Sequence, residues 1–270
     1  MQLIRSKEFS IVSPLWDDAL FGFFVKVPKG VIYCYSVARD IFSFHDSDST
    51  PTLLLHHPND RFFPSSTKWR LIPELSLVLL DHSMGIDLER KSLILPLTDD
   101  LLTEYHRRTY TEKHLVDDDF LIEDYCISHK GMMGYRCLKN GKKLWDFQGR
   151  GYLYTEIYKH ENRVYFCTGG SGGFFYALDI ESGQQIVSVK TSGTQCVERI
   201  HNKCYFLAYD KKTSLICVDI QNGEIVESFD LPGKSTIDCR LQRIGDELHA
   251  ITFQHKKGQP PYIYWHTIQL

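Results

Sequence analysis

The sequence predicts an all-β protein, and three observations carry this prediction. A pattern of apolar strand, Asp, turn, Gly and apolar strand recurs around Gly141, Gly183 and Gly223. The steps between these glycines are 42 and 40 residues, a period typical of the four-stranded antiparallel blades of a β-propeller. Aromatic residues make up 13% of the chain, which suits a fold rich in strands.

The composition limits the size of the domain and the class of partner. A chain of 270 residues can bury a sizeable core, so we predict a single propeller domain over residues 1–270. The net charge of −3 lacks the basic excess that is typical of nucleic-acid-binding surfaces. No apolar run approaches the length of a membrane span. We therefore expect neither nucleic-acid binding nor membrane insertion.

The cysteines and the amino terminus bear on the cellular compartment. No two of the eight cysteines form a C-x-x-C pair, and free cysteine packs well as a small apolar residue. Residues 1–8 lack the apolar core of a signal peptide. The sequence thus predicts reduced core cysteines and a cytoplasmic location. The cysteines that lie inside apolar, strand-like runs are Cys34, Cys137, Cys167, Cys204 and Cys217.

The second half of the chain predicts regular units of four strands. Alternation and turn residues place the strands of two full units at 152–158, 164–167, 174–180, 185–190, 196–200, 204–208, 215–220 and 225–229. Three more, at 239–244, 248–253 and 262–268, have no fourth partner after them. The strand-like run at residues 3–12 is expected to supply it and so to close the ring without an exposed edge.

The first half is less regular, and the longer steps between its turns predict two insertions. Turns near Asp40 and Lys91 are expected to take the place of the later glycines, which gives six blades, with seven as the alternative. The first insertion spans residues 56–68. The second spans residues 98–114, where Thr98 is expected to cap a short helix. The apolar residues of that helix are Leu101, Leu102 and Tyr105. Strands are expected at 22–27, 30–37, 41–44, 53–55, 69–72, 75–80, 85–88 and 93–97.

The repeat resembles the quinoprotein-type β-propeller motif, Ala-x-Asp-x-x-Thr-Gly followed by a polar pair, an apolar residue and Trp. Asp would cap the turn, Gly would supply a positive φ, and Trp would lock one blade onto the next. Matching residues are Ala177, Asp179, Ser182 and Gly183 in one copy, Asp219 and Gly223 in the next, and Gly141 and Trp145 in the earliest. Val187 and Glu227 stand at the Trp position of the other two copies.

The resemblance implies an architecture more than a chemistry. Quinone-dependent dehydrogenases with this repeat have larger, eight-bladed rings, a calcium site and often an adjacent cysteine pair. This chain has no Cys-Cys pair and is much shorter, so we expect no quinone and no other cofactor. The smaller relatives of the repeat class are mainly protein-binding platforms.

Two motifs with catalytic potential have simpler explanations. Residues 169–173 satisfy Gly-x-Ser-x-Gly, but a nucleophile elbow needs a helix after it, and a strand is expected here. His56 and His57 with Asp60 include ligand types for a metal, yet no H-x-x-x-H spacing accompanies them. We interpret the glycines as a hairpin connection and the histidines as loop residues, and we expect no catalytic or metal-binding residue.

Two groups of residues are candidates for binding a partner. The run Asp117, Asp118 and Asp119 could receive a basic surface, or it could be a solvated loop. Aromatic residues on the insertions could anchor a partner, or they could cover the edge of the ring. These aromatic candidates are Phe62, Phe63, Trp69 and Tyr105.

The sequence therefore predicts a non-enzymatic, cytosolic β-propeller that binds another protein as a platform, adaptor or inhibitor of the immunity-protein type. The alternative is a metal-dependent hydrolase or lactonase-like enzyme with a site in the central channel. The two hypotheses differ at the channel mouth. An enzyme would gather His, Asp or Glu side chains around one point there, whereas a platform would present an apolar or charged patch on one face.

Overall fold

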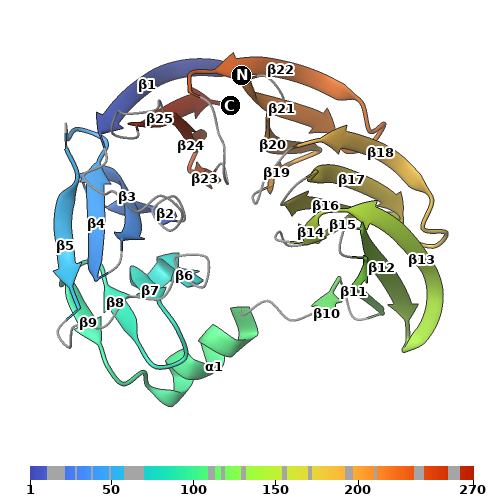
Figure 1. Ribbon diagram of the computed structural model, residues 1–270, viewed down its shortest axis with the longest axis horizontal. Helices are drawn as coiled ribbons and strands as arrows, with labels where there is room; N and C mark the ends of the chain where they lie inside the picture. Colours follow the sequence, from blue (N-terminus) through green and yellow to red (C-terminus); the bar gives the residue numbers. More distant parts are fainter. Residues whose placement is uncertain are drawn as a thin grey trace.

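The computed structural model describes residues 1–10, 22–27, 29–37, 39–48, 50–57, 70–108, 113–116, 119–128, 132–153, 157–169, 172–191, 197–209, 212–233, 240–254 and 262–270. Within these ranges the chain forms six antiparallel sheets of the propeller type, each with a path of four paired strands. Figure 1 shows the sheets side by side around a common centre. The all-β prediction is confirmed.

The first three sheets follow the chain in order. The first contains β2 (Gly22–Val27), β3 (Gly30–Val37), β4 (Asp40–His45) and β5 (Thr52–His56). The second contains the short strands β6 (Arg70–Ile72), β7 (Leu77–Leu79), β8 (Gly85–Asp87) and β9 (Ser92–Ile94), with a 3-10 helix at Pro73–Leu75. Helix α1 (Asp99–Arg108) precedes the third sheet, which contains β10 (Lys113–Leu115), β11 (Phe120–Ser128), β12 (Met132–Lys139) and β13 (Lys142–Arg150).

The last three sheets contain the regular repeats. The fourth has β14 (Tyr152–Leu153) and β15 (Tyr158–His160), which both pair with β16 (Arg163–Gly169), then β17 (Phe174–Asp179) and β18 (Gln185–Lys190). The fifth has β19 (Val197–Ile200), β20 (Lys203–Tyr209), β21 (Thr213–Asp219) and β22 (Ile225–Leu231). The sixth has β23 (Arg240–Ile244), β24 (Glu247–Gln254), β25 (Tyr262–Gln269) and β1 (Gln2–Ser10).

Strand β1 is the fourth strand of the sixth sheet. It pairs antiparallel with β25 from Gln2 opposite Gln269 to Ser10 opposite Tyr262. The two ends of the chain therefore lie side by side, as Figure 1 shows. This is the pairing that the sequence predicts for the amino-terminal run.

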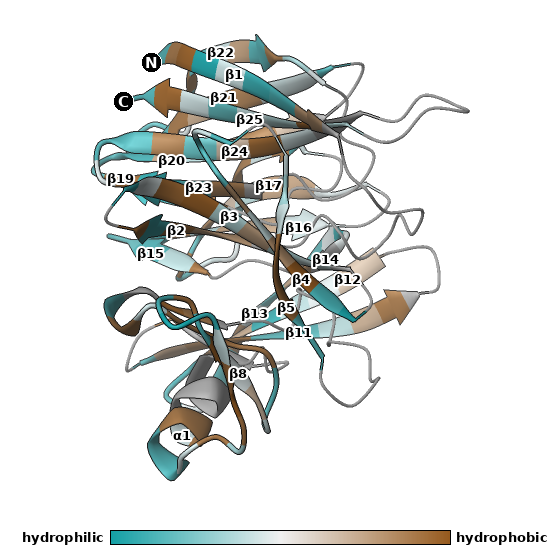
Figure 2. Cartoon of the chain, turned by 90° about the vertical axis from the view of Figure 1, so that its left-hand side faces the viewer, coloured by the Kyte–Doolittle hydropathy of each residue, from teal (hydrophilic) through white to brown (hydrophobic). Residues whose placement is uncertain are grey.

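Neighbouring sheets bury apolar side chains between them. Five core clusters each join two sheets, namely the sixth with the first, the first with the second, and the third through sixth in succession. Among the described residues, no such cluster joins the second sheet to the third. There, Ile72, Leu77 and Leu79 pack instead against Leu97 and Leu101, which precede and begin α1. Figure 2 shows the sheets from the side, with hydrophobic colour along many strands.

Of the two turns that the sequence assigns in the first half, the one at Lys91 is placed correctly and the one at Asp40 is not. The turn at Lys91 joins the third and fourth strands of the second sheet, as the later glycine turns do in theirs, and Lys91 has φ 51°. The placement at Asp40 is wrong, because that turn joins the second and third strands of the first sheet. Alternation of apolar and polar residues predicts where strands lie. Without the Asp and Gly of the repeat, it does not show which strand of a sheet each one is. Thr98 precedes α1 as expected, and its Oγ1 accepts the backbone N–H of Leu101 at 3.4 Å.

The five cysteines predicted to be core residues are all buried and free of disulfides. Their side chains contribute to the packing within and between sheets, for example Cys137 in the cluster of the third and fourth sheets. Burial raises the pKa of the Cys34 and Cys204 thiols to about 12. They therefore remain neutral apolar residues at physiological pH. Among the described residues, no helix is long and apolar enough to cross a membrane.

Candidate functional site

The Asp-turn-Gly repeat forms a tight turn between the third and fourth strands of its sheet. In the fourth sheet, Asp179 Oδ1 accepts the backbone N–H of Ser182 at 2.8 Å and that of Glu181 at 3.1 Å. The Ser182 hydroxyl and these N–H groups hold the pKa of the Asp179 carboxyl below its ordinary value. Gly183 then takes a φ of +71°, a conformation that residues with a Cβ rarely adopt.

The residue at the Trp position of one sheet packs on the turn of the next sheet. Trp145 Nε1 donates a hydrogen bond to the Ile180 carbonyl at 2.7 Å, and a Cβ on Gly183 would lie only 2.6 Å from the indole. Val187 covers the following turn in the same way, since a Cβ on Gly223 would lie 2.3 Å from its methyl group. The glycines are thus required by the neighbouring sheet as well as by their own φ angles.

Between the fifth and sixth sheets, the residue at the Trp position is charged: it is Glu227. Cross-strand pairing gives Glu227 the place of Val187, because each is opposite a buried residue of the preceding strand, Cys217 and Ala177 respectively. The Glu227 carboxylate accepts hydrogen bonds from the Met1 amine at 3.0 and 3.2 Å. Leu3 is opposite Ile268 as Ile225 is opposite Val218, so Met1 takes the register position of Gly223.

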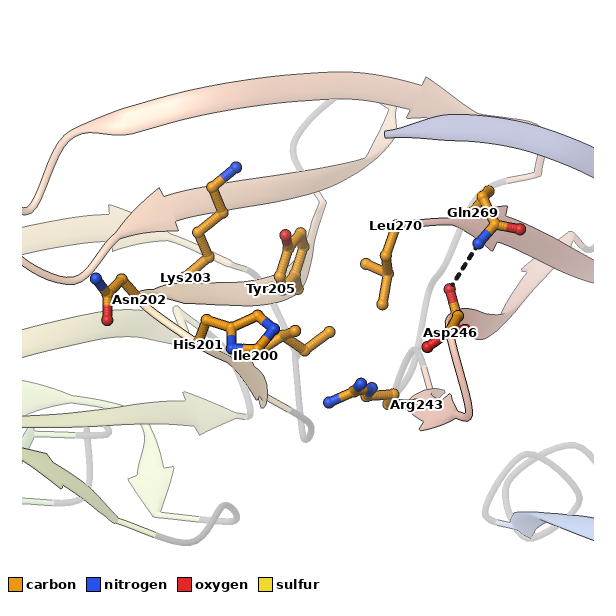
Figure 3. Close-up of a pocket in the computed structure, with 9 residues that line it drawn as sticks. All are labelled: Ile200, His201, Asn202, Lys203, Tyr205, Arg243, Asp246, Gln269 and Leu270. Atoms are coloured by element: carbon orange, nitrogen blue, oxygen red, sulfur yellow. Dashed lines mark hydrogen bonds between the residues drawn. The ribbon is translucent and has the colours of Figure 1, made fainter.

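A cavity of about 540 Å³ lies at this junction. Its lining includes two cationic residues and one acidic residue, drawn from the fifth and sixth sheets. In Figure 3, Tyr205 and Leu270 face each other across the space, and Arg243 extends toward His201. Gln269 Nε2 donates to the Asp246 backbone carbonyl at 3.1 Å and so ties the end of β25 to the β23–β24 turn.

The preceding junction shows what normally fills this space. There, Arg163 Nη1 donates to the Ile220 carbonyl at 2.8 Å and also to the Gln221 carbonyl. The Tyr165 hydroxyl donates to the same Ile220 carbonyl at 2.5 Å. The turn of the fifth sheet therefore fits into a socket on the fourth sheet, where two side chains bind its backbone carbonyls.

The same two positions of the fifth sheet line the cavity. Lys203 is opposite Asp219, as Arg163 is opposite Asp179, and Tyr205 takes the position of Tyr165 on the same register. Burial raises the pKa of Tyr205, with the Cys217 thiol and the Glu227 carboxylate adding to the shift. The phenol therefore remains protonated at neutral pH and can donate a hydrogen bond.

A second cation reaches the cavity from the sixth sheet. In the preceding junction Arg199 donates to the Lys159 carbonyl at 3.1 Å, and its other terminal nitrogen lies 2.8 Å from His160 Nδ1. Arg243 has the equivalent position in the sixth sheet, but its Nε donates to Gly245 in its own turn at 2.8 Å. Its guanidinium lines the cavity. The site thus combines an ammonium, a guanidinium and a phenol around one cavity.

Of the partner-binding candidates from the sequence, the structure describes Asp119 in full, and Asp119 does not line this cavity. Tyr105 belongs to α1, but its side chain is outside the described residues. Asp119 is exposed and its backbone carbonyl accepts the N–H of Asn140 at 2.9 Å. Phe62, Phe63, Trp69, Asp117 and Asp118 lie outside the described residues. The sequence signal nearest to the cavity was the last group of three strands, which predicts the pairing of β1 with β25 in the sixth sheet.

The two motifs with catalytic potential lie partly outside the described residues, which include neither Ser171 nor Asp60. The glycine run leads directly into β17, and a Cβ on Gly173 would lie 2.2 Å from the Thr168 carbonyl, so this glycine permits a close hairpin connection. His56 Nδ1 lies 2.6 Å from Asp40 Oδ1, while Asp60 is outside the described residues. In the part of the chain that the structure describes, no group of three or more His, Cys, Asp or Glu side chains is arranged to hold a metal ion.

No protein-family model and no curated protein sequence matches this chain. Solved structures resemble it only distantly. The AfRom2 CNH domain is 9% identical with a TM-score of 0.41, covering 98% of this chain and 99% of its own. BamB from Moraxella catarrhalis is 10% identical with a TM-score of 0.36, covering 92% and 83%. The computationally designed Ika8 protein is 9% identical with a TM-score of 0.40, covering 100% of both chains. Likenesses at this level assign no function.

Proposed function

We propose that this protein is a non-enzymatic, cytosolic β-propeller that binds another protein. In this proposal the six sheets are the six blades of one closed ring, residues 1–270 form a single domain, and the repeat belongs to the quinoprotein-like class without its quinone. The protein acts as a platform, adaptor or inhibitor of a specific partner.

One observation carries the proposal, the cavity between the fifth and sixth sheets. In the neighbouring junction the equivalent side chains Arg163 and Tyr165 bind backbone carbonyls of a turn. Lys203 and Tyr205 present the same donor types to the cavity at the next junction. Donors that bind peptide carbonyls in one junction are suited to bind the peptide backbone of another protein in the next.

The partner-binding candidates from the sequence extend this proposal to other surfaces. Asp119 is exposed at the start of β11, and α1 carries Tyr105 beside the second sheet. Asp119 and Tyr105 form a second group of residues to be mutated, together with Phe62, Phe63, Trp69, Asp117 and Asp118. Loops supported by a rigid scaffold commonly carry binding residues.

Affinity capture with the full chain from its source cell tests the proposal. We expect one protein to be retained in a stable complex that elutes at a single stoichiometry after purification and reconstitution from the separate components. Failure to recover any partner that reconstitutes would contradict protein binding. Metal analysis of the same preparation tests the alternative, because a stoichiometric metal with hydrolytic activity would favour the enzyme with a site in the channel.

A further inference from the structure

We propose that the innermost strands of four consecutive sheets form a binding site for a compact polyanion, a small ligand rich in phosphate groups. Four basic side chains make up the site, and we call them the cationic arc: Lys159, Arg199, Arg243 and Lys26. They belong to the fourth, fifth, sixth and first sheets, respectively. The proposed protein-binding function neither requires this site nor predicts it.

The members of the cationic arc share one register position. Each is the last residue but one of its innermost strand, and the next residue along the strand forms the pair that closes the turn to the second strand. The pairs are Lys26 with Val31, Lys159 with Val164, Arg199 with Cys204, and Arg243 with Leu248. Because the register is the same, the four side chains leave their strands on the same face and at the same end of the ring.

Contacts between neighbouring innermost strands hold these positions next to one another. Arg199 donates to the backbone carbonyl of Lys159 at 3.1 Å, which joins the fifth sheet to the fourth. Strand β23 lies against both β19 and β2. Between β23 and β2, Gln242 Nε2 donates to the Phe24 carbonyl at 2.8 Å, and its Oε1 accepts the Phe24 N–H at 3.1 Å. Figure 1 shows these innermost strands nearest to the common centre of the sheets.

Neutral groups, not carboxylates, contact the cationic arc. Lys26 and Arg243 are exposed, and among the described residues neither forms an ion pair. Arg199 binds two neutral acceptors of the fourth sheet, a backbone carbonyl and a histidine nitrogen. The Nζ of Lys159 lies 4.9 Å from the centre of the Phe120 ring. These contacts position the cations without neutralising them.

The adjoining turns do not cancel the charge of the arc. Their acidic and basic residues are equal in number: Glu161, Asp246 and Glu247 against Lys29, Arg163 and Lys203. The described innermost strands as a group carry seven basic residues and one acidic residue, although the whole chain has 31 basic and 34 acidic residues. Like charges gathered around one axis create a field that attracts an anion.

The chemistry and the placement of the cations indicate the class of ligand. Guanidinium groups bind phosphate oxygens through two parallel hydrogen bonds, and ammonium groups bind them as point charges. A short chain of phosphates carries several charges in a small volume, as four cations around one axis require. A long polyanion such as a nucleic acid would extend over the rest of the molecule, where acidic residues are in excess.

Inorganic tripolyphosphate is a suitable probe. Its binding to the full-length chain is measured by isothermal titration calorimetry in the presence of EDTA, beside sulfate at equal ionic strength. We expect saturable binding of tripolyphosphate that weakens as salt is added, and binding of sulfate that is at least about tenfold weaker. No saturable binding of tripolyphosphate up to about 1 mM would overturn the proposal.

Three double variants test whether the charge of the arc is responsible. Lys26→Ala with Arg243→Ala is expected to weaken binding at least about tenfold. Lys26→Arg with Arg243→Lys keeps both charges and should bind within about threefold of the native chain. Lys142→Ala with Lys190→Ala removes two exposed cations of the outer strands β13 and β18 and should leave binding unchanged. Circular dichroism verifies that each variant is folded, and equal affinities in all of them would contradict the assignment.

A pair of single variants separates the arc from the cavity between the fifth and sixth sheets. Lys203 lines that cavity together with Arg243, but it is not a member of the arc. We expect Lys26→Ala to weaken tripolyphosphate binding at least about threefold, and Lys203→Ala to change it by less than about twofold. A larger loss from Lys203→Ala than from Lys26→Ala would place the anion in the cavity and overturn the proposed site.

A hexa-aspartate peptide tests the class of ligand, and tighter binding of this peptide than of tripolyphosphate would reject phosphate recognition. All these measurements use the purified chain without a partner. Failure of tripolyphosphate to bind therefore leaves the proposed protein-binding function intact. Failure to recover a protein partner likewise leaves the cationic arc intact.

Discussion

The junctions around the fourth sheet and the junction between the fifth and sixth sheets solve the same packing problem differently. At the first two, Trp145 and Val187 cover a glycine turn with apolar surface. At the third, Glu227 binds the Met1 amine, and a cavity of about 540 Å³ lies nearby. At the turn position, apolar contact covers the first two junctions, whereas a partly exposed ion pair lies at the third, beside the apolar cluster that packs the fifth and sixth sheets together.

This difference indicates which junction has donors available to bind another molecule. A turn that is locked by its neighbour presents its carbonyls only to its own chain. At the junction of the fifth and sixth sheets, the equivalent side chains Lys203 and Tyr205 line a cavity. We expect the apolar contacts of Trp145 and Val187 with their turns to contribute more to stability than the ion pair of Glu227 with Met1.

The largest effect is expected from Trp145→Ala. The indole is only 7% exposed and covers the turn of the fourth sheet, so its removal leaves a cavity and an unpaired Ile180 carbonyl. We expect a loss of about 4 kcal/mol in the free energy of unfolding, measured by urea denaturation. Leu144→Ala, a change at the exposed neighbouring residue, should cost less than about 0.5 kcal/mol. Similar costs for the two variants would show that the indole lock is unimportant.

Two alanine substitutions at glycines separate the lock from the backbone conformation. Gly183 and Gly141 have φ angles of +71° and +74°, but only Gly183 lies beneath an indole. We expect Gly141→Ala to cost about 1 kcal/mol, from backbone strain alone, and Gly183→Ala to cost at least about 2 kcal/mol. Thermal unfolding measures both. Equal losses would mean that the turn's own conformation, not the neighbouring sheet, selects glycine.

Buried histidines should make the sixth sheet sensitive to pH. Burial lowers the pKa of both His249 and His266 to about 4, compared with 6.5 in the unfolded chain. The unfolded state therefore binds more protons between these values, and stability falls as the pH falls through 6.5, with the loss levelling off below about 4. From pH 7 to pH 5 we expect a loss of roughly 2 kcal/mol per histidine.

Urea denaturation at pH 7, 6 and 5 measures this dependence. His249→Gln and His266→Gln should each reduce the slope, even though each also lowers stability at pH 7, since His266 bonds Ser6 and Thr252. Asp179 and Asp146 do not interfere, because their lowered pKa values affect stability only near and below the ordinary carboxyl range. An unchanged slope in both variants would show that other groups titrate.

The smallest effect is expected from Glu227→Gln. The carboxylate is 38% exposed, so its ion pair with the Met1 amine is screened by water. We expect a loss of at most about 1 kcal/mol, and less at 1 M salt, in urea denaturation. A loss as large as that of Trp145→Ala would contradict the expectation that the apolar contact at the turn stabilises the protein more than the ion pair does.

The sequence by itself determined the repeated elements of this protein. Asp179, Gly183 and their counterparts specify turns through local hydrogen bonds and a positive φ, which nearby residues alone decide. Alternation likewise predicted β1 and its pairing with β25, because the last sheet lacked a fourth strand. The turn at Asp40 was placed between the wrong pair of strands. The first sheet lacks the Asp and Gly of the repeat, which elsewhere mark the turn between the third and fourth strands.

Only the tertiary structure decided which side chains meet. Lys203, Arg243 and Leu270 are separated by up to 67 residues, and they share a cavity because strand register and the packing of two sheets bring them together. Register fixes which face of a strand each side chain occupies, and it depends on pairing between distant segments. The turn lock of Trp145 on Gly183 is of the same kind. The local sequence forms the turn, and the packing of the neighbouring sheet determines which side chain covers it.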